Sequence, residues 1–282
     1  MNIIRFFSCF IIAAAQVSAF FCAQTARGQD AHKEGLRGNL AFENRNKLFL
    51  GECKKSSLDP ELYNIADKFI YGDVFESGVL NRKQRELITI VALAVSQCYG
   101  QLQEHVSAAL NIGVPAWEIR EAVYTISPII GFAKVFDAMD AVNIKFKERG
   151  IKLPLENLGT VSEGERFKKG REIQAPIYGD RTKNIAYGLP RNSDYIPRFL
   201  TEVCFGDFYT RQGIDIKTRE LLIFCALVSL GGVEYSIGSH AMGNLKVGNS
   251  KEVLIAAIIQ CVPYIGFPKA LNALRIIKDS EL

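Results

Sequence analysis

The feature that most constrains the fold of this chain is an internal repeat with a period of about 134 residues. Gly72-Asp73 recurs as Gly206-Asp207, and Arg85-Glu86-Leu87 recurs as Arg219-Glu220-Leu221. After one extra residue near Gly231-Gly232, the match continues at an offset larger by one. It then pairs His105 with His240, Gly113 with Gly248, and Pro128 to Phe132 with Pro263 to Phe267. A period this long, in a chain of 282 residues, indicates two duplicated domains rather than a solenoid.

The apolar residues within each copy predict helices, because they recur at spacings of three and four and no segment alternates as a strand would. Leu87, Ile90, Val91, Ala94 and Val95 show this spacing. Glycine and proline residues then mark where helices stop and start, at Gly113 with Pro115 and at Pro128 with Gly131. We therefore expect an all-α fold with two tandem helical-bundle domains.

The first 26 residues predict a signal peptide. Arg5 precedes an almost entirely apolar run, Phe6 to Phe21, which is shorter than the ~20 residues that a membrane-spanning helix needs. Small residues at Val17-Ser18-Ala19 or Gln24-Thr25-Ala26 offer cleavage sites, while the bulky Phe21 argues against lipidation of Cys22. We expect export, to the periplasm, with no stable membrane span after cleavage. An uncleaved anchor is the alternative.

Composition and the repeat together divide the rest of the chain. Residues 27–55 are polar and are expected to form an extended N-terminal arm. The first domain is placed at 56–150, a linker rich in Gly and Pro at 151–163, and the second domain at 164–282. The net charge of +4 is spread along the chain without a run of like charges, so nucleic acid is not an expected partner.

Two of the histidines are candidates for a catalytic role. The mature chain contains only His32, His105 and His240, and the last two occupy the same place in the repeat. Such a histidine either packs between helices or serves as a general acid or base facing a pocket. No other histidine or cysteine lies at ligand spacing from either of them, so no metal site is predicted.

Around the first of these histidines, Glu86, Cys98 and His105 form a candidate catalytic group. Cys98 and His105 are two helical turns apart and would share a face of one helix. Ser96 is expected to cap that helix, which leaves Cys98 in the first turn, where the helix dipole favours a thiolate. Glu86 could orient His105 or relay a proton. The alternative roles are a surface ion pair for Glu86 and a small buried residue for Cys98.

This spacing resembles the signature E-x11-C-x2-C-x3-H of the alkylhydroperoxidase D-like branch of the carboxymuconolactone decarboxylase family. The resemblance covers nearly the whole mature chain, twice, and implies two tandem alkylhydroperoxidase D-like bundles. In that branch two cysteines carry out redox chemistry, with Glu and His assisting proton transfer. This chain has Gln101 at the position of the second cysteine, so only Glu86, Cys98 and His105 match.

The second repeat resembles the γ-carboxymuconolactone decarboxylases, which lack the cysteine pair. Val233 and Ser236 fill its two cysteine positions, while Glu220 and His240 remain. The resemblance implies acid–base chemistry without a cofactor, in which unsaturation of a lactone delocalises the charge left by departing CO2. Carbon would be reprotonated by His240 or Glu234, and the substrate carboxylate would be held by Arg211 or Arg219.

Three classes of function follow. The favoured one is a cofactor-free lyase or isomerase that acts on a small carboxylated lactone-like substrate, with Glu234 and His240 as the working pair. The rival is a thiol peroxidase or oxidoreductase that uses Cys98. The third is a non-catalytic oligomeric binding protein. Because single-domain relatives form rings of three or six domains, we expect the two-domain chain to assemble as a trimer.

Overall fold

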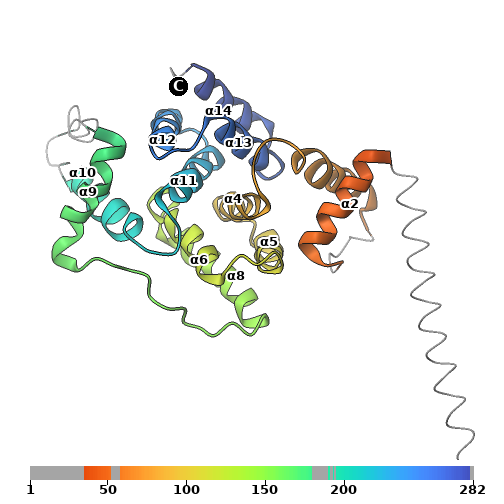
Figure 1. The fold of residues 1–282 in the computed structure, drawn as a ribbon, viewed down its shortest axis with the longest axis horizontal. Coiled ribbons are helices and arrows are strands. Elements are labelled where there is room, and N and C mark those ends of the chain that lie inside the picture. Colours follow the sequence, from red (N-terminus) through yellow and green to blue (C-terminus); the bar gives the residue numbers. More distant parts are fainter. Residues whose placement is uncertain (1–34, 52–57, 180–189, 191–192, 194, 280–282) are drawn as a thin grey trace, which may run out of the picture. The chain divides into compact units, whose positions relative to one another are not determined.

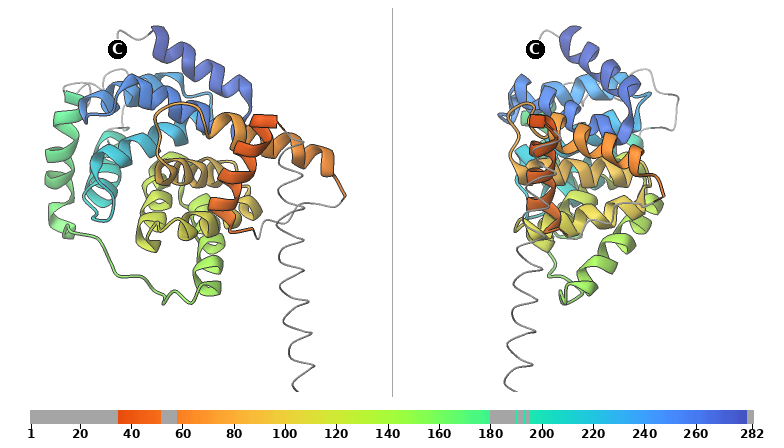
Figure 2. Two further views of the ribbon diagram at one scale, coloured as in Figure 1. Left: turned by 45° about the vertical axis from the view of Figure 1, so that its right-hand side comes forward. Right: turned by 90° about the vertical axis from the view of Figure 1, so that its right-hand side faces the viewer.

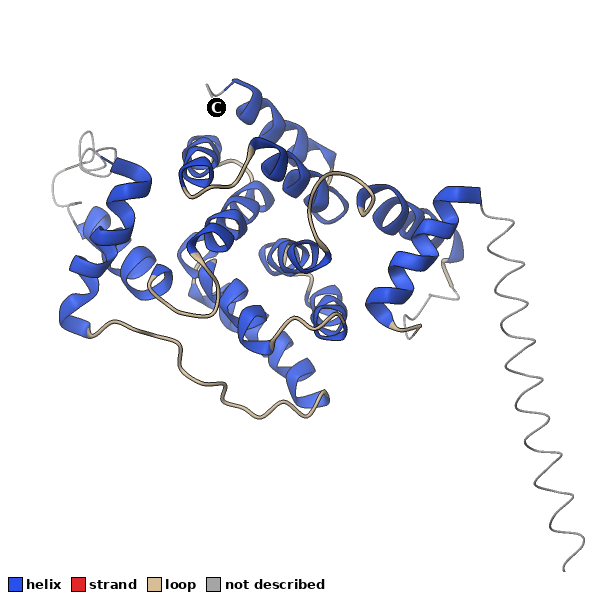
Figure 3. Cartoon of the chain, viewed as in Figure 1, coloured by secondary structure: helices blue, strands red, loops and turns tan. Residues whose placement is uncertain are grey.

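The computed structural model of the chain describes residues 35–51, 58–179, 190, 193 and 195–279 (Figure 1). Across these ranges the chain is helical or irregular, and they contain no strand (Figure 3). The all-α fold predicted from the sequence is therefore confirmed. The predicted signal peptide lies outside the described residues. None of the described helices is both long enough and apolar enough to cross a membrane.

The two repeats form matching series of helices. The first series is α2 (Gly35–Phe49), α3 (Pro60–Asp67), the π-helix η1 (Lys68–Val74), α4 (Arg82–Val95), α5 (Tyr99–Asn111), α6 (Ala116–Thr125), α7 (Ser127–Ile130) and α8 (Phe132–Glu148). The second series is the short 3-10 helix η2 (Glu163–Glu165), α9 (Arg166–Tyr178), α10 (Tyr195–Phe199), the π-helix η4 (Leu200–Tyr209), α11 (Ile216–Leu230), α12 (Glu234–Lys246), α13 (Lys251–Ile265) and α14 (Phe267–Asp279).

The chain forms two compact units that do not coincide with the two repeats. Among the described residues, the smaller unit contains 35–47, 51 and 58–76. The larger unit contains residues 48–50 and everything described from Ser77 onward. The helices α4 to α8 of the first repeat therefore share one unit with the whole described part of the second repeat. The linker predicted at 151–163 divides the sequence repeats, but it does not separate the compact units.

Helix α2 corrects the prediction of an extended N-terminal arm. Residues 35–49 are helical, and two polar side chains of this helix, Arg37 and Asn44, have hydrogen-bond partners within the smaller unit. Arg37 Nε donates to Asp73 at 2.9 Å, and Asn44 Nδ2 donates to the backbone oxygen of Tyr71 at 2.9 Å. A polar composition was therefore compatible with an ordered helix, because hydrogen bonds and ion pairs satisfy its side chains.

The same arrangement recurs in the second repeat, within the larger unit. Arg166 Nε donates to Asp207 at 2.7 Å, and α9 packs against η4. A Cβ added at Gly206 would lie 2.5 Å from the backbone oxygen of Arg166, just as one at Gly72 would lie 2.7 Å from that of Arg37. Helix α2 is thus the counterpart of α9, at an offset of about 129 residues instead of 134.

The core of the larger unit is built around α4 and α11, which pack against each other (Figures 1 and 2). Every residue of α4 from Arg85 to Val95 is buried, and so is every residue of α11 from Arg219 to Ser229. Other helices cover the pair: α5, α6, α8 and α13 contact α4, while α6, α7, α12, α13 and α14 contact α11. This covering explains why both segments are apolar almost all round.

The two repeats exchange equivalent contacts across this core. Arg85 of α4 donates to Gln260 of α13 at 2.8 Å, and Arg219 of α11 donates to Thr125 of α6 at 2.7 Å. Thr125 and Gln260 occupy the same place in the repeat, so the two hydrogen bonds are reciprocal. Within the larger unit, helices α4 to α8 therefore pack against the second repeat as one half of a pseudo-dimer.

Candidate functional site

Both repeat histidines are held by a glutamate from the preceding long helix. His105 Nδ1 of α5 lies 2.8 Å from Glu86 Oε2 of α4, and His240 Nδ1 of α12 lies 2.7 Å from Glu220 Oε1 of α11. Both glutamates are fully buried. Glu86 is therefore buried against His105 and not in a surface ion pair, and its role in orienting His105 or relaying a proton stays a prediction. We call these pairs the first and second Glu–His pairs.

Helix caps fix where each glutamate falls. Asn81 caps α4 by accepting from the backbone N–H of Gln84 at 2.9 Å, and the Gln84 side chain accepts from the backbone N–H of Asn81 at 3.0 Å. Asp215 caps α11 by accepting from the backbone N–H of Thr218 at 2.7 Å. Each glutamate then lies about one turn into its helix, on a face that packs against the histidine-bearing helix.

The second Glu–His pair is part of a larger hydrogen-bond network. Tyr178, at the end of α9, donates its hydroxyl proton to Glu220 Oε1 and lies 2.7 Å from His240 Nδ1. Tyr209, at the end of η4, donates to the other carboxylate oxygen of Glu220. The Glu220 carboxylate thus accepts from two phenols and one imidazole, which is the way a buried charge is normally stabilised.

Burial keeps the two phenols in their donor form. Desolvation, and then the charge of Glu220, raise the pKa of Tyr178 and of Tyr209 well above the ordinary value for tyrosine. The same two causes raise the pKa of the nearby Cys204 thiol to about 12. All three groups therefore stay neutral at physiological pH, and Glu220 is the acceptor of the network.

The network also selects the tautomer of His240. Both neighbours of Nδ1 are oxygens, and Glu220 already accepts from the phenols, so Nδ1 carries a proton and donates it. The other ring nitrogen, Nε2, then has a free lone pair in the neutral imidazole. The His240 side chain keeps 16% of its surface exposed. This geometry leaves Nε2 available as an acid or base.

The first Glu–His pair is enclosed instead. The His105 side chain is 2% exposed. Phe49 packs edge-on against its ring with the centroids 5.8 Å apart, and Tyr264 of the second repeat does the same at 5.6 Å. The Tyr264 hydroxyl lies 3.5 Å from His105 Nε2. Here Nε2 faces a phenol and aromatic rings.

The carboxylate of the first pair has fewer donors. Glu86 Oε1 is buried and has no hydrogen-bond partner among the described residues. The repeat offsets explain the difference, because Phe49 occupies the position of Tyr178 and Phe75 occupies that of Tyr209. Two hydroxyl groups that serve Glu220 therefore have no equivalent at those positions of the first repeat.

A comparison with protein families identifies the fold that carries these pairs. The model of the carboxymuconolactone decarboxylase family matches residues 60–143 and 195–279, which is more than half of the chain. The chain belongs to this family. The 4-carboxymuconolactone decarboxylase of Acinetobacter baylyi is a relative, 24% identical over 122 residues, which cover 42% of this chain and 89% of that protein. The tandem arrangement and the resemblance noted from the sequence are thereby confirmed.

Cys98, which matches the first cysteine of the redox branch of the family, stands apart from the first Glu–His pair. It is exposed and occupies the N-cap position of α5, and its thiol donates to the backbone oxygen of Ser96 at 3.6 Å. The prediction that Ser96 caps this helix was wrong, because Ser96 is the C-cap residue of α4. With the buried His105 two turns along α5, the structure gives no hydrogen bond between thiol and imidazole.

Glu234 does not lie beside His240. It is exposed in the first turn of α12, six residues before His240, so the two side chains leave the helix about 120° apart. The carboxylate that contacts His240 is Glu220. The residues in contact are therefore Glu220 and His240, which lie 20 residues apart on two helices, and a catalytic role for Glu234 stays a prediction.

The two arginines suggested as substrate ligands have internal partners. Arg211 donates to both carboxylate oxygens of Glu121, at 2.8 and 2.9 Å. Arg219 is fully buried, donates to Thr125 and to the backbone oxygen of Arg211, and lies 3.5 Å from the same carboxylate. Both charges are thus used to join the two repeats, and a role in binding a substrate carboxylate stays a prediction.

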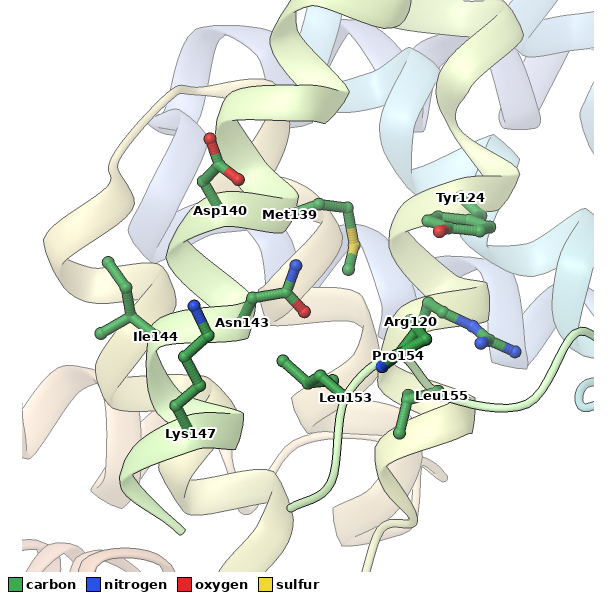
Figure 4. A pocket seen from close by; sticks show the side chains of 10 residues that line it. All are labelled: Arg120, Tyr124, Met139, Asp140, Asn143, Ile144, Lys147, Leu153, Pro154 and Leu155. Carbon is green, nitrogen blue, oxygen red and sulfur yellow. The ribbon is translucent and has the colours of Figure 1, made fainter. Parts of the chain in front are cut away.

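A pocket of about 630 Å³ lies in the first repeat, between α6, α8 and the linker (Figure 4). Figure 4 shows Arg120 and Tyr124 on one wall and Asn143 and Lys147 on the other. Its remaining lining residues are Met139, Asp140, Ile144, Leu153, Pro154 and Leu155. Arg120 donates to the backbone oxygen of Glu156 at 2.7 Å and lies 3.2 Å from the Glu121 carboxylate, so its charge has internal partners. Neither repeat histidine lines this pocket.

No metal site is apparent in the described parts of the chain, where no group of three or more His, Cys, Asp and Glu side chains is arranged to hold an ion. The Glu220 carboxylate already accepts from Tyr178 and Tyr209.

Proposed function

We propose that this family member is a cofactor-free lyase or isomerase acting on a small carboxylated lactone-like substrate, with the working site in the second repeat. His240 is the catalytic acid–base residue, and Glu220 is the residue that positions it. One observation carries the proposal: His240 keeps an exposed edge while its Nδ1 is held by a fully buried carboxylate. The relation to a 4-carboxymuconolactone decarboxylase supports the substrate class.

The proposed reaction begins when the bond between the substrate carboxylate and its carbon breaks and CO2 leaves. The electron pair of that bond is delocalised into the unsaturated lactone carbonyl. His240, protonated on both nitrogens, then donates the Nε2 proton to carbon, and solvent returns a proton to Nε2. The Glu220 carboxylate stabilises the imidazolium form before the transfer, as the aspartate does in a catalytic triad.

The test compares the same substitution in the two repeats. In the full chain, with 4-carboxymuconolactone as the probe, we expect His240→Gln to lower kcat by a factor of about 100 or more. The matched variant His105→Gln should retain turnover, since His105 is enclosed by Phe49 and Tyr264. Both chains should unfold at temperatures near that of the wild type. Equal activity of the two variants would contradict this assignment.

We also propose that three chains assemble into a ring of six domains. Exposed apolar residues support this assembly, because they recur at equivalent positions of the last helix of each repeat: Phe132 and Phe136 on α8, and Phe267 and Leu271 on α14. Such paired patches are typical of surfaces that a neighbouring domain covers. Light scattering after size exclusion should give three times the mass of one mature chain, and a monomer mass would refute the ring.

A further inference from the structure

The two repeats differ at two positions that, in the second repeat, lie against the Glu–His pair. The second repeat has Tyr178 and Gly243, and the first has Phe49 and Ala108. We infer that Tyr178, in the space left by Gly243, is a positioning residue that makes the second site competent, whereas Phe49 and Ala108 leave the first site unable to act. This inference rests on the proposed function and says which repeat carries it out and why.

The equivalence of Phe49 and Tyr178 has a structural basis. Each is the last residue of its helix, α2 or α9. Tyr178 packs edge-on against His240 with the ring centroids 5.4 Å apart, as Phe49 packs against His105 at 5.8 Å. The two rings thus have the same role in packing, and the hydroxyl is the difference between them.

The hydroxyl connects both members of the second pair. It donates to Glu220 Oε1 and lies 2.7 Å from His240 Nδ1, so it fixes the carboxylate and the imidazole relative to each other. In the first repeat the histidine-bound oxygen is Glu86 Oε2, which has the imidazole of His105 as its partner and no phenol, because Phe49 carries no hydroxyl. The other oxygen, Glu86 Oε1, corresponds to the acceptor of Tyr209 and has no hydrogen-bond partner among the described residues. The first Glu–His pair therefore lacks the phenol that fixes the carboxylate and the imidazole relative to each other in the second pair.

Gly243 provides the space for this hydroxyl. It lies on α12, one turn after His240, where a side chain would point at the network. A Cβ added there would lie 2.9 Å from the Tyr178 hydroxyl and in still closer contact with Glu220 Oε1. The first repeat has the methyl group of Ala108 at this position, fully buried.

The two positions are therefore coupled. A tyrosine needs a glycine opposite it, and a phenylalanine leaves room that an alanine methyl group fills. Changing one member alone produces either a clash or a void, both of which destabilise a packed core. Changing both converts one arrangement into the other.

Kinetics test the positioning role. Tyr178→Phe should lower kcat about 10- to 100-fold, because a hydrogen bond to a charged group is lost. KM should stay within about twofold, since the hydroxyl acts on His240 rather than on substrate. The control Tyr195→Phe, at an exposed tyrosine, should leave both constants unchanged. A rise in KM at constant kcat would overturn the positioning role.

A spectroscopic readout does not depend on turnover. The chain has three histidines, so the imidazole resonance of His240 can be assigned by substitution. The Nδ1 proton of His240 should exchange with solvent at least about tenfold faster in Tyr178→Phe than in the wild type, because one of its two oxygen neighbours is removed. Unchanged exchange would overturn the inference. Fast exchange without any lactone turnover by the wild type would refute the proposed function alone.

A thermal-stability cycle tests the coupling. Gly243→Ala should lower the melting temperature by several degrees, and adding Tyr178→Phe should recover at least half of that loss. In the first repeat, Phe49→Tyr and Ala108→Gly should each lower the melting temperature, and the double variant should melt above the lower of the two. Additive losses in both cycles would overturn the coupling.

Discussion

The two Glu–His pairs share their backbone setting and differ in what surrounds them. Each glutamate is fully buried on a central helix, and each holds Nδ1 of a histidine at 2.7 to 2.8 Å. Glu220 accepts from two tyrosines in addition, whereas Glu86 leaves one oxygen without a hydrogen bond in the described structure. A glutamate and a histidine at these positions therefore do not by themselves define a working site. The tyrosines that bind the Glu220 carboxylate come from other helices, α9 and η4.

The repeat with the enclosed histidine has the exposed thiol, and the repeat with the exposed histidine edge has the buried thiol. The first repeat has an exposed thiol, Cys98, near an enclosed histidine. The second has an enclosed thiol, Cys204, near a histidine with an exposed edge. Duplication thus gave one repeat a reachable imidazole and the other a reachable thiol. The lyase and peroxidase hypotheses can be separated by treating the two repeats as each other's control.

The largest expected effect is on the carboxylates. Glu220→Gln should abolish lactone turnover and lower the free energy of unfolding by about 3 kcal/mol, because the new amide N–H₂ faces donors that need an acceptor. Glu86→Gln should lower the free energy of unfolding by about 1 kcal/mol. One Glu86 oxygen accepts from His105, and the amide N–H₂ of glutamine can take the place of the other, which has no hydrogen-bond partner in the described structure. Urea unfolding of both variants measures the difference. Equal losses would mean that the two networks are equivalent.

A second large difference is expected in thiol labelling. Iodoacetamide at neutral pH should modify Cys98 at least about 100 times faster than Cys204, because Cys98 is exposed while burial raises the pKa of Cys204 to about 12. Mass spectrometry of timed digests measures both rates, and Cys98→Ser is the control. Since the Cys98 thiol donates to Ser96, we expect His105→Ala to leave its rate unchanged. A marked slowing would instead favour the thiol peroxidase hypothesis.

The smallest effect concerns alkaline stability. The folded-state pKa of Tyr178 and of Tyr209 is raised by burial, so these phenols bind protons more tightly in the folded chain. The stability that this contributes is fully present below the unfolded pKa of about 10 and declines as pH rises from there toward the folded values. Absorbance at 295 nm should show them ionising only as the chain unfolds.

The variant Tyr178→Phe/Tyr209→Phe sharpens this prediction. Without the two phenols, the loss of stability above about pH 10 should be shallower than in the wild type. An unchanged alkaline profile would show that the phenols of the second site are not linked to folding.

Much of the fold was determined by the sequence. Apolar residues at spacings of three and four predict helices because they give each helix a buried face, and the helices end where Gly113 and Gly131 adopt positive φ, at 83° and 86°. The sequence also revealed the repeat, because short motifs such as Arg85-Glu86-Leu87 recur in the second copy. The equivalent positions of the two histidines followed from the same alignment. Helix α2 was missed, although Gly35 and Arg37 recur as Gly164 and Arg166 at the shorter offset.

Only the tertiary structure decided which side chains contact the positions that recur in both repeats, such as Glu220 and His240. Tyr178 is 42 residues from Glu220 and 62 from His240, on another helix, and no local spacing connects them. Arg211 reaches Glu121 from 90 residues away, and no local spacing predicts this ion pair between the repeats. A periodic pattern records which face of a helix is buried. Which side chains meet there depends on how the helices pack, and buried polar groups have to find their partners in that packing.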